Sequence, residues 1–120
     1  MSISNYGENA LLNAVAGTSF SAANTYVKLH LGDPGEDGTA NPAAETTREA
    51  VTWGTATTGS LASAATVEWT NVSTTEVYTH WSLWDADTAG NCLWVGALGA
   101  SASMTAGDTF QLTSLTLTLD

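Results

Sequence analysis

Apolar and polar residues alternate along most of this chain, and this is the pattern of β-strands with one buried face. Runs of Gly, Ser, Thr, Asn and Asp separate the alternating segments and are typical of turns. No helical segments lie between the strands, so the pattern predicts antiparallel pairing. The predicted strands cover residues 26–31, 48–53, 66–70, 77–85, 92–98 and parts of 110–119.

Helical periodicity is found in residues 4–16, close to the N-terminus. Ser4 or Asn5 can cap this helix, and Gly17 suits the position just after its end. The residues on its apolar face are Leu11, Leu12 and Val15. So short a helix is unstable alone and is expected to pack on the sheet or on another subunit.

These elements predict a mainly β protein, an antiparallel β-sandwich or distorted barrel with one short N-terminal helix. We expect residues 1–120 to form a single domain. Alternation places the following residues in the core: Val27, Leu29, Leu31, Val51, Val67, Trp81, Leu83, Leu93, Val95, Phe110 and Leu112. Residues 54–65 are rich in Thr, Ser, Ala and Gly and are expected to form a long turn.

The net charge of the chain excludes two classes of partner. Two basic residues face twelve acidic ones, which gives a formal net charge of −10. Nucleic acids and anionic membranes both require Lys and Arg, so neither is an expected partner. We expect no signal peptide, no membrane insertion and synthesis in the cytoplasm, because no apolar run approaches the roughly 18 residues of a membrane span.

Few residues suggest site chemistry. Cys92 is the single cysteine, so an intrachain disulfide is excluded. The segment that starts with Asp85 and Asp87 resembles the start of a calcium-binding loop. Ala89, however, occupies a position where such a loop needs a ligand, so a hairpin turn is the better interpretation. The carboxylates at 33, 36 and 37 follow no metal-ligand spacing, so we expect no metal and no cofactor.

The chain shows no sequence sign of an enzyme. His30 and His80 lie within strands and are expected on an exposed face or at an interface. No Gly-x-Ser-x-Gly motif places a nucleophile beside them.

Aromatic residues are more numerous than one small sandwich needs inside. Alternation places Trp84 and Trp94 together on the outer side of a hairpin formed by residues 77–98. Three interpretations are open for that side: a subunit interface, cover by the helix and long loops, and a surface that stacks on sugars.

Several phrases of the sequence resemble a known family. They are the initial SNYGENALLNA, the strand and loop YVKLHLGDPGEDGTAN, the later REAVTWG and the C-terminal Thr/Leu strand. Together they are similar to small virion proteins of tailed bacteriophages, which are tail-fibre proteins related in character to head-decoration modules. The resemblance extends over nearly the whole chain and includes no catalytic motif.

The resemblance implies a non-enzymatic structural protein of the virion, made in the host cytoplasm. Two placements are open, a tail-fibre or tail-tip component and a capsid decoration (cement) protein. The implied partners are other capsid or tail proteins and further copies of the chain, in a homotrimer. A carbohydrate-binding module that recognises a cell-surface glycan is the alternative, and a hydrolase ranks below it.

The helix and the long loop at residues 32–47 are the expected contact segments, because long Pro- and Gly-rich loops often order against a partner. The predicted interface residues are Leu11, Leu12, Val15, Asp33, Pro34, Glu36, Asp37, Trp84 and Trp94.

Overall fold

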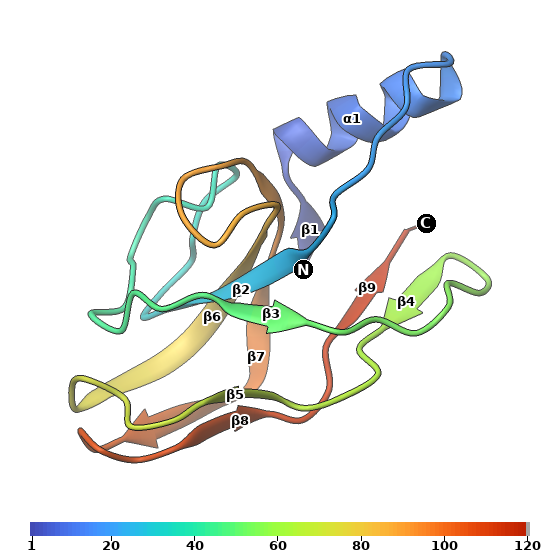
Figure 1. Cartoon of the computed structure of the whole chain (residues 1–120). Coiled ribbons are helices and arrows are strands. Elements are labelled where there is room, and N and C mark those ends of the chain that lie inside the picture. Colours follow the sequence, from blue (N-terminus) through green and yellow to red (C-terminus); the bar gives the residue numbers. More distant parts are fainter. Residues whose placement is uncertain (120) are drawn as a thin grey trace.

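The computed structural model describes residues 1–119. These residues contain a short helix near the N-terminus and strands throughout the rest of the chain (Figure 1). The elements are β1 (Ser2–Ile3), α1 (Asn5–Val15), β2 (Thr25–His30), β3 (Glu49–Val51), β4 (Ser60–Ala62), β5 (Val67–Trp69), β6 (Glu76–Trp84), β7 (Cys92–Met104), β8 (Phe110–Leu112) and β9 (Thr116–Thr118).

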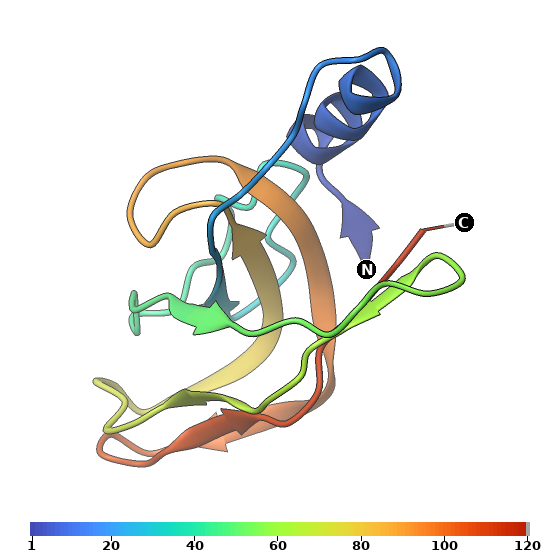
Figure 2. The same cartoon turned by 45° about the vertical axis from the view of Figure 1, so that its right-hand side comes forward.

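All strand pairs are antiparallel. A five-stranded sheet has the order β1-β7-β6-β2-β3, and two ribbons, β5–β8 and β4–β9, complete the fold. The long strands β6 and β7 curve strongly and pass beneath the β5–β8 ribbon (Figure 2). Within residues 1–119 the sheets do not close into a barrel. The prediction of a mainly β, antiparallel protein with one short N-terminal helix is confirmed for the described residues.

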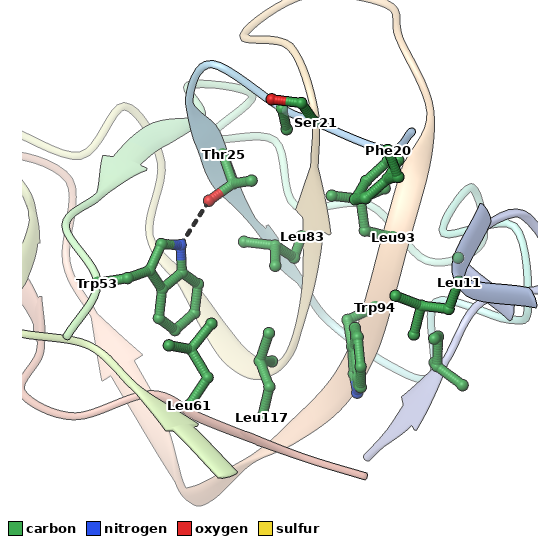
Figure 3. A pocket seen from close by; sticks show the side chains of 13 residues that line it. Leu11, Phe20, Ser21, Thr25, Trp53, Leu61, Leu83, Leu93, Trp94 and Leu117 are labelled. Carbon is green, nitrogen blue, oxygen red and sulfur yellow. Dashed lines mark hydrogen bonds between the residues drawn. The ribbon is translucent and has the colours of Figure 1, made fainter. Parts of the chain in front are cut away.

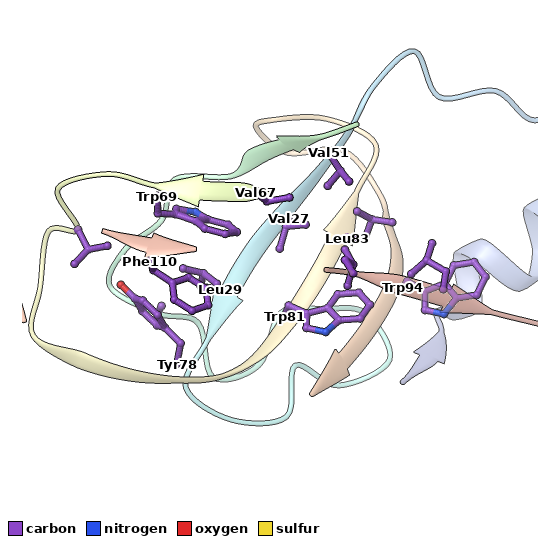
Figure 4. Packing of buried hydrophobic residues seen from close by; sticks show 14 residues of the cluster. Val27, Leu29, Val51, Val67, Trp69, Tyr78, Trp81, Leu83, Trp94 and Phe110 are labelled. Atoms are coloured by element: carbon purple, nitrogen blue, oxygen red, sulfur yellow. The ribbon is translucent and has the colours of Figure 1, made fainter. Parts of the chain in front are cut away.

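The core lies between the five-stranded sheet and the β5–β8 ribbon (Figure 4). Val27 and Leu29 of β2 are fully buried there. The Phe110 ring centroid lies 5.6 Å from that of Trp69 and 5.4 Å from that of Tyr78, within the range of favourable aromatic pairs. Burial and backbone pairing therefore hold the fold together.

Two irregularities of β6 and β7 decide which side chains enter the core. Residues 98–101 of β7 lie opposite the single residue Thr79 of β6. As a result Tyr78 and Trp81, which are three residues apart, both belong to the core, although strict alternation would separate them. Further along, Leu93 is an extra residue between the pairs Leu83–Trp94 and Trp84–Cys92.

Most of the predicted core is confirmed by burial, and the exceptions have local causes. Leu31 is 42% exposed, because β2 ends one residue earlier. Val95 is buried, but in a cluster with Trp84 and Cys92 that is separate from the main core. Leu112 is half-buried. The predicted core residues that are buried in the main core or beside it are Val27, Leu29, Val51, Val67, Trp81, Leu83, Leu93 and Phe110.

The expected long turn at residues 54–65 is wrong in part, because it contains β4. Leu61 of β4 pairs with Leu117 of β9. The short strand β1, which pairs with β7, was also not expected from the sequence.

Candidate functional site

Helix α1 begins and ends where its capping residues place it. The Ser4 hydroxyl accepts a hydrogen bond from the Gly7 backbone N–H at 3.0 Å and donates one to the Cys92 carbonyl. At the other end Gly17 has a φ of 101°, and Thr18 N–H donates to the Asn13 carbonyl at 2.8 Å. A Cβ at Gly7 would meet the Leu93 carbonyl oxygen at 2.5 Å, so this glycine lets the first turn lie directly on β7.

Beyond its first turns, α1 projects away from the sheets (Figure 2). Leu11 is half-buried and faces the body of the protein. Leu12 is 68% exposed and Val15 is 89% exposed. The helix therefore presents two large apolar side chains to solvent at the end of the molecule.

The loop at residues 32–47 is ordered by its own hydrogen bonds. The Asp33 carboxylate accepts from Gly35 N–H at 2.9 Å, and the Asp37 carboxylate accepts from the Thr39 hydroxyl at 2.7 Å. These bonds to Thr39 lower the pKa of Asp37 below its usual value. Pro34 is buried, whereas the side chains of Asp33, Glu36 and Asp37 face solvent.

Trp84 lies on the outer face of the main sheet, covered by this loop and by Arg48. A Cβ at Gly38 would lie 3.1 Å from the Trp84 ring, so the loop backbone packs directly on the indole. On the ring itself the Arg48 guanidinium sits 4.1 Å from the centroid and donates to the carbonyls of Ala86 and Ala89. Of the three interpretations of this side of the hairpin, cover by a long loop is therefore the one that the structure shows for Trp84.

Trp94 lies on the opposite side of the sheet from Trp84. It pairs with Leu83 and belongs to the main core cluster, because the extra residue Leu93 reverses the alternation. The prediction that both tryptophans share one outer face is therefore wrong. The Trp94 indole is 9% exposed, and its buried Nε1 atom has no hydrogen-bond partner.

An apolar cleft opens between α1 and the β4–β9 ribbon (Figure 3). Its volume is about 390 Å³. Trp53 is fixed on one wall by a 2.7 Å hydrogen bond from Nε1 to the Thr25 hydroxyl. The lining residues are Ile3, Gly7, Leu11, Phe20, Ser21, Ala22, Thr25, Trp53, Leu61, Leu83, Leu93, Trp94 and Leu117.

A second hollow, of about 290 Å³, brings together residues from both predicted contact segments and the predicted interface residue Trp84. Glu36 and Asp37 of the long loop and Trp84 line it beside Tyr6 of α1 and Asn91. Asn91 closes the hairpin after β6, because its backbone and side-chain N–H groups donate to the Asp85 carboxylate at 2.7 and 3.0 Å. The hairpin interpretation of residues 85–91 is therefore confirmed.

His30 forms a sealed hydrogen-bond chain beneath the long loop. Its Nδ1 lies 2.9 Å from the Ala40 carbonyl oxygen, which requires a proton on that nitrogen. Its Nε2 lies 2.7 Å from the Ser82 hydroxyl, which in turn accepts from Trp84 Nε1 at 2.7 Å. His30 and Ser82 are fully buried, so the expectation of an exposed or interface His30 is wrong, and no substrate reaches this pair.

Cys92 is equally unsuited to nucleophilic chemistry. It is buried against the long loop, and desolvation raises the pKa of its thiol to about 11. Within residues 1–119, no group of three or more His, Cys, Asp and Glu side chains is arranged to hold a metal ion. None of the helical structure in this range is long and apolar enough to cross a membrane.

Sequence reasoning missed much of the cleft. Phe20 is an isolated aromatic residue in a stretch of small residues, and this was the available signal for it. Leu61 carried no signal, because it lies in a segment that is typical of a turn. The missed wall residues are Phe20, Trp53, Leu61 and Leu117.

Among curated proteins no match is found. The model of the family described as podophage GP4 fiber I protein gp80 matches residues 2–120. This confirms the resemblance to small tailed-phage virion proteins of the tail-fibre kind. Because the match covers nearly the whole sequence, the chain belongs to the family of podophage GP4 fiber I protein gp80.

Proposed function

We propose that the chain is a non-enzymatic, outward-facing building block of a phage tail fibre, assembled as a homotrimer. Membership of the fibre family makes it a structural protein of the virion. The observation that supports assembly is the projecting helix α1, whose Leu12 and Val15 are 68% and 89% exposed. Apolar side chains presented in this way are typical of surfaces that a partner covers.

The acidic loop is proposed as a second contact, with a different protein. Glu36 and Asp37 face solvent, and the chain has only two basic residues with which another copy could pair. A virion protein with a basic surface is the better complement. Pro34 and Trp84 are buried beneath this surface and support the loop from within.

A structural role without catalysis is supported by the sealed groups. The Ser82 hydroxyl is already bound to His30 and Trp84, and the Cys92 thiol has its pKa raised to about 11. Neither group is free to act as a nucleophile at neutral pH.

The oligomeric state is tested by native mass spectrometry of the purified protein. The expected result is a species of three times the 12.4 kDa chain mass. A monomer at all concentrations would overturn the proposal that copies assemble through α1.

The location of the protein in the virion is tested on purified particles that are separated into heads and tails. We expect the protein in the tail fraction, as the family description favours. Recovery with the heads alone would instead support the capsid decoration role.

A further inference from the structure

We propose that the apolar cleft between α1 and the β4–β9 ribbon is the receiving site for helix α1 of a second copy of the chain. This inference rests on the proposed assembly and adds the surface at which two copies meet. The apolar strip formed by Leu12 and Val15 enters the cleft of the neighbour, between its Leu11 and its Leu61.

The cleft has the chemistry to accept this strip. Every residue that lines it is uncharged, in a chain whose net charge is −10. A third hollow, of about 240 Å³, shares Leu61, Trp94 and Leu117 with the cleft and extends to the half-exposed Leu119. The residues that line it are also uncharged. The two hollows together form an apolar groove beside the β4–β9 ribbon.

Trp94 lies in the wall that the two hollows share, and it carries a buried polar atom without a partner. Its indole is nine-tenths buried and lines both hollows, yet Nε1 has no hydrogen-bond partner. Buried N–H groups are nearly always paired in complete structures. Asn9 and Asn13 lie exposed on α1 beside the apolar strip, so a neighbouring helix would place polar side chains at this wall.

The net charge of the chain limits where a second copy can dock. Two chains of net charge −10 repel each other over most of their surfaces, so close approach requires uncharged regions on both. The strip and the groove are two such regions. Glu8 is the one charged residue of α1, and it lies in the first turn.

The chain cannot fill its own groove with its own strip. Gly7 and Leu11 of α1 already form one wall of the cleft, while Leu12 and Val15 of the same helix face solvent. The contact is therefore heterologous, strip against groove. In the proposed trimer the rotation closes after three copies and repeats the contact as a ring.

The first test changes the strip without disturbing the helix. In the variant Leu12→Gln/Val15→Gln, both substitutions keep good helix formers at exposed positions. Removing the apolar surface should weaken association by about tenfold or more, measured by sedimentation over a concentration series. The matched control is Val77→Gln, which changes a 44% exposed side chain on β6 and should associate as the wild type does.

The second test locates the contact. Two separately tagged variants, Val15→Cys and Leu119→Cys, are mixed and mildly oxidised. A disulfide-linked product that carries both tags is expected, because Val15 of one copy should lie at the groove rim of the next. The native Cys92 is buried and should not compete. Mixing Val77→Cys with Leu119→Cys provides the control and should give no such product.

The outcomes separate this inference from the proposed function. If the wild type assembles, but the Gln variant associates normally and no mixed disulfide forms, copies meet elsewhere and the groove is not the receiving site. If the wild type is monomeric at every concentration, both the assembly and its site are overturned.

Discussion

Gly96 leaves no room for a side chain, because the Trp81 ring lies directly against it. It lies opposite Trp81 in the β6–β7 pair. A Cβ at Gly96 would be 2.6 Å from Cζ2 and 2.8 Å from Cε2 of the Trp81 indole. Ordinary carbon contacts are about 3.5–4.0 Å, so the ring would have to move by about 1 Å. Trp81 is 3% exposed within the core and has little room to do so.

We expect Gly96→Ala to lower the free energy of unfolding by about 1–2 kcal/mol. Overpacking of a core typically costs about 1–3 kcal/mol. The gain from replacing glycine by alanine within a strand offsets about 0.5–1 kcal/mol of this. Urea unfolding followed by circular dichroism measures the change as a lower midpoint at an unchanged slope.

Gly99 in the same strand is the matched control, because a Cβ there meets nothing within 4 Å. Gly99→Ala should be neutral or slightly stabilising. In a Trp81→Leu background, which removes the indole, the cost of Gly96→Ala should nearly vanish and give a coupling of about 1–2 kcal/mol. If Gly96→Ala costs no more than Gly99→Ala, or costs the same in both backgrounds, the Trp81 ring does not restrict this position.

Two further predictions concern buried polar groups. Burial lowers the pKa of His30, so the unfolded chain binds the proton more readily, and stability should fall as the pH drops below about 6.5 towards the lowered folded value. Urea midpoints at about pH 7.5 and about pH 5 should differ less for His30→Gln than for the wild type, and an equal loss in both would contradict this source. Ser4→Ala removes the α1 cap and the bond to the Cys92 carbonyl, and should cost about 1–2 kcal/mol of unfolding free energy, with Ser2→Ala as the exposed control. Equal midpoints for these two serine variants would show that the cap is dispensable.

The sequence alone determined the elements whose causes are local. A capping serine or asparagine and Gly17 predicted a helix over residues 4–16, and the structure has Asn5–Val15. Alternation placed Val27 and Leu29 on one buried face, as observed. The excess of acidic residues and the family phrases were likewise visible without any fold. Capping and a period of two residues act within a few positions, so a linear pattern records them.

Tertiary structure alone decided which faces meet and what covers them. Because of the extra residue Leu93, Trp94 points into the main core while Trp84 lies on the opposite face of the sheet. A shift of one residue exchanges the two faces of a strand. Leu61 found its partner Leu117 far along the chain, so the ribbon and its cleft had no local signal. His30 became fully buried only because the long loop folds over its strand. Each of these depends on contacts between distant segments, which the order of residues along one strand does not encode.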